Sequence, residues 1–148
     1  MKATLAETAI AGRFALAAFL GLVVGVEREY RGKSAGLRTF ALIALGAAAF
    51  TGIAIARFPM SGDRVIQGVV AGIGFLGAGI IFQREEGIVE GLTTAASIWS
   101  VAAIGVLIGS SAYVSGLVAT LLVLAILEID RLPALRRFKR RDQSEESG

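Results

Sequence analysis

Five carboxylates at the edges of otherwise apolar stretches are the first candidates for chemistry in this chain. They are Glu27, Glu29, Glu85, Glu86 and Glu90. Hard oxygen ligands of this kind suit Mg²⁺, so Glu27, Glu29 and Glu85 are weak candidate contacts for that ion. Basic residues lie among them, and Glu27 with Arg31 has the i, i+4 spacing of an ion pair on a helix. We favour an internal charge network, with a low-affinity Mg²⁺ contact as the alternative.

The predicted charge network joins two charged loops that the topology below places on the same side of a membrane. Its members are Glu27, Arg28, Glu29, Arg31, Lys33, Arg38, Glu85, Glu86 and Glu90.

Other catalytic chemistries find little support in the residue types. The chain has no cysteine and no histidine, so a zinc site, a disulfide framework and thiol chemistry are not expected. No nucleophile stands beside a base and no nucleotide cradle is present, so we expect neither an enzyme nor a cofactor. The segment 72–77 matches G-x-G-x-x-G, but it lies inside an apolar run without the strand that a dinucleotide site requires.

A series of hydroxyl groups follows the second charged loop. Thr93, Ser97 and Ser100 stand at i, i+4 and i+7, which places them on one face of a helix. They either bond to carbonyls one turn earlier and to neighbouring helices, for about 1 kcal/mol or less each, or contact a partner. Trp99 lies in the middle of the same apolar run, away from the depth at which tryptophan anchors a span. Packing and partner contact are both open for it.

The elements that position these residues are expected to be membrane-spanning helices. The composition is 55% hydrophobic and the mean hydropathy is +0.71, more than a soluble domain of this size needs. A helix crosses the hydrocarbon core with about 20 apolar residues. Five apolar stretches predict an all-α integral membrane fold: 8–26, 39–56, 65–82, 92–108 and 113–127. Four spans are the structural alternative, and we treat the first span as retained rather than cleaved.

Positive charge orients these spans. Most of the 15 Lys and Arg residues fall on one side when five spans alternate. They are Arg28, Arg31, Lys33, Arg38, Arg84, Arg131, Arg136, Arg137, Lys139, Arg140 and Arg141. The positive-inside rule therefore places the amino end outside and the carboxyl end in the cytoplasm. Residues 1–130 form the predicted membrane domain, and 131–148 form a basic tail that contacts lipid and is disordered at its end, with no nucleic acid partner expected.

Glycines inside the apolar runs predict where helices approach closely, because glycine lets two backbones touch. The candidates for helix packing are Gly21, Gly25, Gly68, Gly72, Gly74, Gly77 and Gly79. The strip from Gly72 to Gly79 predicts that the third span is the central helix. On this interpretation, Gly74→Leu disrupts assembly.

Three blocks together resemble the MgtC/SapB family of bacterial membrane proteins. They are residues 21–29 (GLVVGVERE) with 33–39 (KSAGLRT), residues 72–81 (GIGFLGAGII) and residues 91–99 (GLTTAASIW). The resemblance covers about residues 16–127 and implies a multi-pass protein of the bacterial inner membrane. The chain looks like a short form, because several members of the family carry a cytoplasmic domain after the last helix.

The same resemblance implies a function linked to magnesium limitation. For some members this is a small regulator that binds the F-type ATP synthase and restrains proton-coupled ATP metabolism. By that analogy the partner-binding candidates here are Thr93, Thr94, Ser97, Trp99 and Ser100. Threonine at 93 departs from the asparagine of some virulence-associated members. A Mg²⁺ or other cation permease is the alternative, and a homodimer is a further expectation.

Overall fold

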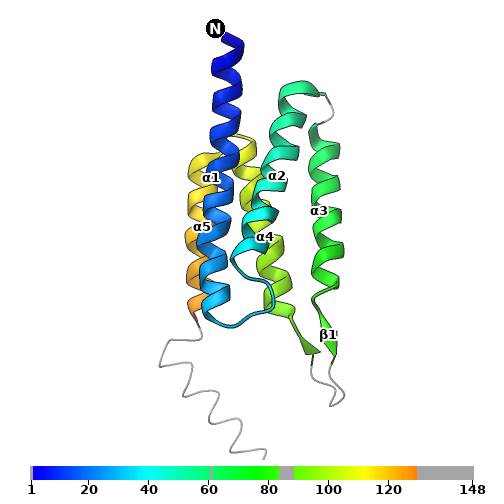
Figure 1. Cartoon of the computed structure of the whole chain (residues 1–148). Coiled ribbons are helices and arrows are strands. Elements are labelled where there is room, and N and C mark those ends of the chain that lie inside the picture. The colour runs from blue at the N-terminus through cyan, green and yellow to red at the C-terminus, as the bar shows by residue number, and fades with distance from the viewer. Residues whose placement is uncertain (1, 61, 84–88, 130–148) are drawn as a thin grey trace, which may run out of the picture.

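The structure is a computed structural model that describes residues 2–60, 62–83 and 89–129. Five α-helices form nearly all of the described chain (Figure 1). They are α1 (Lys2–Tyr30), α2 (Leu37–Arg57), α3 (Gly62–Ala78), α4 (Leu92–Gly109) and α5 (Tyr113–Glu128). Two short antiparallel strands, β1 (Phe82–Gln83) and β2 (Val89–Glu90), join α3 to α4 and pair Phe82 with Glu90. The prediction of an all-α fold with about five helices is confirmed.

Four helices of the described chain are long and apolar enough to cross a membrane. These spans are Glu7–Tyr30, Leu37–Arg57, Gly62–Ile80 and Leu92–Gly109. The fifth helix, α5, is shorter, at 16 residues. The predicted basic tail at 131–148 lies outside the described residues.

Contacts at both ends of α5 show that it runs the depth of the bundle. At its start, the Tyr113 hydroxyl accepts a hydrogen bond from Arg13 Nε of α1 at 3.1 Å. At its end, the Leu127 carbonyl accepts one from Arg31 Nη2 at 3.1 Å. A helix of 16 residues is about 24 Å long, which is shorter than the hydrocarbon core of about 30 Å. The amino-terminal part of α1 extends beyond the other helices at the Arg13 end (Figure 1).

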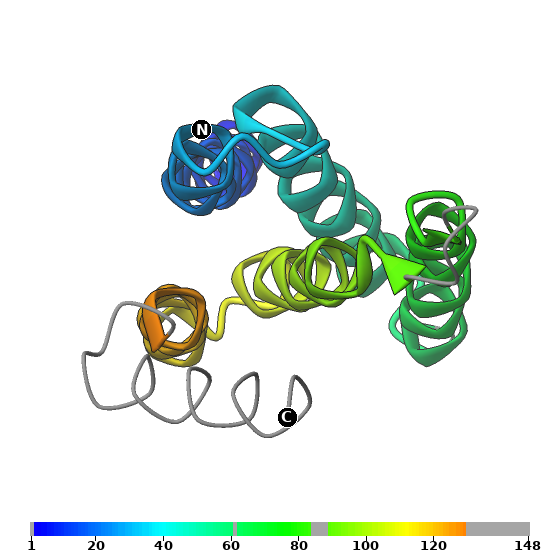
Figure 2. The same cartoon turned by 90° about the horizontal axis from the view of Figure 1, so that it is seen from below.

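The central helix of the bundle is α4. Viewed along the bundle, α4 lies between α5 on one side and α3 on the other (Figure 2). It also contacts α1 and α2, and Ile98, Val101, Ile104 and Ile108 are buried in the shared core. The expectation that the third span is central is therefore wrong.

Two glycines explain the central place of α4. A Cβ at Gly105 would collide with the carbonyl of Ala44 on α2, and one at Gly109 would stand 2.6 Å from the carbonyl of Ala48. The backbones of α2 and α4 thus meet along glycine and alanine faces. Close backbone approach of this kind is the usual basis of helix association in lipid.

Helices α1 and α2 also approach each other closely at glycines. A Cβ at Gly25 would stand 2.6 Å from Leu37 Cα, and one at Gly21 would stand 2.9 Å from Ala44 Cβ. Phe40, Val24 and Ala17 are fully buried at this contact. These two glycines hold the end of α1 against the start of α2, and so position the charged loop between them.

The third helix, α3, lies at the edge of the bundle instead. Only Gly62, Ile73 and Gly77 of this helix are buried, and a Cβ added at Gly77 would stand 3.7 Å from Ala95 Cβ of α4. Positions for a Cβ at Gly68, Gly72 and Gly74 have nothing within 4 Å, and the position at Gly79 meets only carbonyls of its own helix end. Most of this glycine strip is therefore left open by the chain's own packing, which removes the basis for expecting Gly74→Leu to disturb it.

Candidate functional site

Charged residues gather at one end of the bundle, which we call the charged end: the last turns of α1 and α5, the first turn of α2, and Glu90 just before α4. Glu27 lies at its centre, where one carboxylate oxygen is 2.8 Å from Arg31 Nε and the other is 3.2 Å from Arg28 Nε. Arg31 also pairs with Glu128 of α5 at 3.2 Å. These pairs tie α1 to α5 and leave the Arg28 side chain buried.

Glu29 has a structural role at the same end. Its Oε2 accepts a hydrogen bond from the Leu37 backbone N–H at 2.9 Å. That carboxylate thus satisfies a free donor at the start of α2, where an anion is also favoured by the helix dipole. Of the candidate Mg²⁺ contacts, Glu27 and Glu29 are therefore already engaged, while Glu85 lies outside the described residues. Glu86 of the predicted charge network and Arg84, one of the positive charges that orient the spans, also lie outside them. Lys33 and Arg38 are exposed and, in the described part of the chain, form no ion pair.

A polar cavity of about 590 Å³ opens beside this cluster. It brings together the α1–α2 connection and the start of α4, two segments far apart in the sequence. Its lining residues are Gly32, Lys33, Ser34, Glu90, Gly91, Leu92, Thr93 and Thr94. Of the predicted charge network, Lys33 and Glu90 therefore face the same space as the hydroxyl-bearing turn.

Two glycines with positive φ shape the walls of the polar cavity. Gly32 (φ 63°) ends α1: its N–H donates to the Glu29 carbonyl at 2.9 Å and the Lys33 N–H donates to the Arg28 carbonyl at 3.0 Å. This Schellman arrangement fixes where Lys33 leaves the helix. Gly91 (φ 89°) precedes α4, and a Cβ there would collide with the carbonyl of Ile80. Only glycine fits that position.

The five partner-binding candidates on α4 do not form one exposed face. Thr94 and Ser97 are both 4% exposed, and the Ser97 hydroxyl donates to the Thr94 carbonyl at 2.8 Å. Ser100 is half-buried and donates to the Ala96 carbonyl at 2.9 Å. Thr93 is exposed at the polar cavity, and Trp99 is 52% exposed beside α3. The hydroxyls of Ser97 and Ser100 thus bond within their own helix, as the structural interpretation expects.

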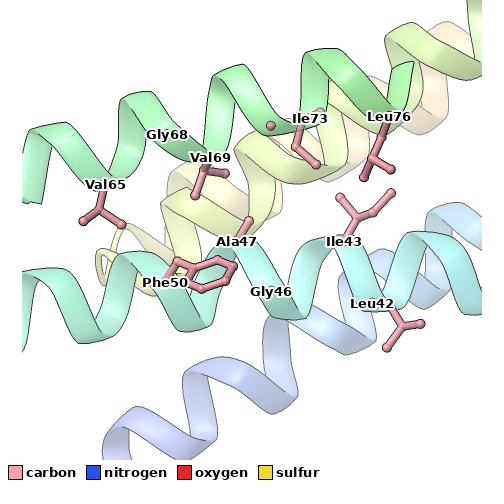
Figure 3. A pocket seen from close by; sticks show the side chains of 11 residues that line it. Leu42, Ile43, Gly46, Ala47, Phe50, Val65, Gly68, Val69, Ile73 and Leu76 are labelled. Atoms are coloured by element: carbon pink, nitrogen blue, oxygen red, sulfur yellow. The ribbon is translucent and has the colours of Figure 1, made fainter. Parts of the chain in front are cut away.

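An apolar groove of about 670 Å³ separates α2 from α3 over much of their length. Figure 3 shows Val65, Val69 and Ile73 pointing from α3 toward α2. This α2–α3 groove is lined by Leu42, Ile43, Gly46, Ala47, Phe50, Val65, Gly68, Val69, Gly72, Ile73 and Leu76. Gly46, Gly68 and Gly72 leave space at its walls, because a Cβ at each would meet nothing within 4 Å.

Sequence reasoning missed several of these residues. Gly105 and Gly109 have the same i, i+4 spacing as Gly21 and Gly25, so that signal was present in the sequence. Glu128 gave no local signal, since its partner Arg31 lies far away in the sequence. Within the described ranges, no group of three or more acidic residues is placed to hold a metal ion.

Apolar helices of spanning length, packed through small residues and capped by charge at one end, define a multi-pass membrane protein. The chain belongs to the MgtC family, whose profile matches residues 14–134. No solved structure matches it significantly.

Three curated relatives illustrate the match. Protein MgtC of Salmonella typhi is 42% identical over 133 residues, covering 84% of this chain and 57% of that protein. Protein SrpB of Synechococcus elongatus is 42% identical over 129 residues, covering 78% of this chain and 71% of that protein. YhiD of Escherichia coli K12, named as a candidate magnesium transporter, is 43% identical over 126 residues, covering 79% and 58%. The chain spans about half the length of the MgtC relatives it matches.

Proposed function

We propose that this chain is a non-enzymatic regulator of the bacterial inner membrane that binds a partner protein within the bilayer. It serves cells under magnesium limitation, and its partner is the F-type ATP synthase, whose proton-coupled ATP metabolism it restrains. The family resemblance supplies the partner. The α2–α3 groove is the observation that supports docking of a partner helix on this chain.

The groove fits an apolar transmembrane helix. Its walls carry aliphatic side chains with glycines on both helices, and Gly68 and Gly72 stand one turn apart on α3. Glycines that a chain leaves unpacked within the bilayer let a second helix approach the backbone closely, where dispersion contacts drive association. Burial of an apolar helix there leaves no charged group unpaired.

The charged end supports a regulator over a carrier. Glu27 is flanked by two guanidinium groups at 2.8 and 3.2 Å, which repel a cation and occupy its carboxylate oxygens. The Oε2 of Glu29 is taken by the Leu37 N–H. Both carboxylates therefore have structural partners: Glu27 holds Arg28 and Arg31 at the end of α1, and Glu29 binds the start of α2.

The test is ATP-driven acidification of inverted membrane vesicles, followed by dye quenching. We expect the chain to slow acidification, and Gly72→Leu to relieve that inhibition because the leucine side chain fills the groove. Gly74→Leu is the matched control, since it adds the same side chain to the same helix, also in open space, outside the groove lining. Acidification that is unaffected by the wild-type chain overturns the proposal.

Substitutions on α4 locate any second contact. Thr93→Ala and Trp99→Ala remove the two exposed side chains of the predicted partner-binding set. If α4 also faces the partner, each substitution reduces the inhibition. Full inhibition by both variants restricts the contact to the α2–α3 groove.

Cation transport is the second candidate, and the name given to the relative YhiD, a candidate magnesium transporter, favours it. It is tested by Mg²⁺ uptake into vesicles reconstituted with the purified chain. A permease that uses the loop carboxylates loses uptake in Glu27→Gln and Glu85→Gln. Uptake that persists in those variants, or no uptake by the wild-type chain, removes this candidate.

A further inference from the structure

We propose that the lipid-facing surface of the bundle fits a bilayer thinner than average, so that the chain prefers phospholipids with short acyl chains around it. Arg13 and the α4–α5 turn (residues 109–112) limit the apolar surface on one side, and the charged end limits it on the other. The inference concerns the surrounding lipid, so it does not depend on the proposed partner.

The depth of the bundle is given by α5, which arginines of α1 bind at both ends. Arg13 Nε donates to the Tyr113 hydroxyl, and Arg31 Nη2 donates to the Leu127 carbonyl, each at 3.1 Å. Viewed along the bundle, α5 is seen nearly end on, so its length of about 24 Å is close to the depth that it covers (Figure 2). The hydrocarbon core of an average bilayer is about 6 Å thicker.

The longer helices are compatible with the same depth. The 18 residues of α4 and the 21 residues of α2 give lengths of about 27 Å and about 32 Å. Both helices run obliquely in the view along the bundle, so each covers less depth than its length (Figure 2). A long helix fits a thin bilayer by tilting, whereas an upright helix that is too short cannot lengthen. The upright α5 therefore decides which bilayer fits.

Arg13 limits the apolar surface on the α1 side. It is half-buried, it interrupts an apolar stretch, and it forms no ion pair within the described residues. Its guanidinium donates to the Tyr113 hydroxyl and, from Nη1 at 3.4 Å, to the Gly109 carbonyl. These bonds hold the charge at the level of the α4–α5 turn. A charged side chain is costly in hydrocarbon, so this level belongs at the lipid headgroups.

The α4–α5 turn gives an independent indication of the same limit. Ser111 is exposed and has a φ of 70°, so the backbone here is not helical. Lipid-exposed irregular backbone does not occur within the hydrocarbon region, because no water satisfies its polar groups there. A bilayer of average thickness therefore draws either this turn or the charged end about 6 Å into hydrocarbon.

Thinning of the bilayer around the chain avoids that cost. The free energy of mismatch grows with each ångström by which the lipid exceeds the apolar depth of the protein. Phospholipids whose acyl chains match the depth of α5 bear the least of it. We therefore expect such lipids to be enriched in the shell around the bundle.

The single tryptophan of the chain reports this enrichment. Trp99 is 52% exposed on α4, so brominated lipid in contact with the bundle quenches its fluorescence. The full chain is reconstituted with brominated dioleoyl phosphatidylcholine as the quencher, and unbrominated dimyristoleoyl or dierucoyl phosphatidylcholine competes with it. We expect the short-chain lipid to bind about two to three times more strongly than the long-chain lipid. Equal competition, or stronger competition by the long-chain lipid, overturns the proposal.

Arg13→Leu tests the limit on the α1 side. Without this charge the apolar surface of α1 continues along residues 9–12, so we expect about half of the preference for short chains to be lost. Arg57→Leu is the matched control, since it removes an exposed positive charge at the same end from α2, which is already long enough. An unchanged preference in Arg13→Leu, or an equal loss in both variants, overturns the proposal. The wild-type comparison requires neither variant, so it decides even if Arg13→Leu does not fold.

Discussion

Single glycines at the charged end hold backbone conformations that other residues resist. Gly91 (φ 89°) combines that conformation with the Ile80 carbonyl directly in the path of a Cβ, whereas Gly32 (φ 63°) has nothing within 4 Å. The left-handed conformation alone costs a residue with a side chain about 1–2 kcal/mol. The steric conflict at Gly91 adds to that cost.

We therefore expect Gly32→Ala to lower the free energy of unfolding by about 1 kcal/mol and Gly91→Ala to lower it by more than about 2 kcal/mol. The measurement is equilibrium unfolding of the purified chain in detergent micelles. Equal losses for the two variants contradict the strand-to-helix geometry at Gly91.

Glu27 joins two arginines, and its removal leaves buried positive charge. Glu27→Gln should destabilise the chain by about 2–4 kcal/mol, because Arg28 is 3% exposed and loses its counter-charge. Thermal unfolding measures this. Glu29→Gln is the control: glutamine keeps an oxygen acceptor for the Leu37 N–H, so the loss should be about 1 kcal/mol or less. A smaller effect for Glu27→Gln than for Glu29→Gln contradicts the role assigned to the cluster.

At the scale of elements, the contact between α2 and α4 organises the bundle. Gly105→Ala inserts a methyl group where the Ala44 carbonyl lies, so we expect a loss of about 1–3 kcal/mol from overpacking. Gly46→Ala, on α2, adds the same methyl into open space and improves helix propensity, so it should be neutral or stabilising by up to about 1 kcal/mol. Unfolding of both variants in micelles is the measurement. If Gly105→Ala stabilises the chain, the close contact between α2 and α4 that places α4 at the centre of the bundle is contradicted.

The sequence predicts the bounds of the five helices closely, but the helix that it predicts to be central is the wrong one. Hydropathy reports the length and the apolar content of a stretch. Both are clear for residues 39–56 and 92–108. It carries no information on which apolar face meets protein and which meets lipid, since both are apolar in a membrane. Gly21 and Gly25 therefore marked a real contact, whereas Gly68 and Gly72, with the same spacing, face open space.

The charged end could be predicted from the sequence only in part, because only its local contacts leave a signal there. The i, i+4 spacing of Glu27 and Arg31 is a local signal, and the pair forms at 2.8 Å. The polar cavity depends on how the α1–α2 connection meets α4, and the pairing of Arg31 with Glu128 depends on where α5 returns. Contacts between distant segments leave no periodic trace in a single sequence.

For the whole molecule, the orientation in the membrane is a prediction that can be tested. Arg31 binds the end of α5, so the α1–α2 connection and the carboxyl end of α5 share one end of the bundle. The positive-inside rule places that end in the cytoplasm. Fusion of green fluorescent protein after Gly148 should therefore give fluorescence, and fusion of alkaline phosphatase should be inactive. Active phosphatase at that position contradicts this orientation.

Cross-linking tests whether the α2–α3 groove receives a helix of the F-type ATP synthase, as we propose. The chain lacks cysteine, so a single cysteine placed at Gly72 or at Gly74 carries a photoreactive probe without competing sites. In native bacterial membranes, we predict an adduct with a membrane subunit of the synthase from position 72 and markedly less from position 74. If no adduct with the synthase forms, or if the two positions give equal yields, the α2–α3 groove is not the docking site.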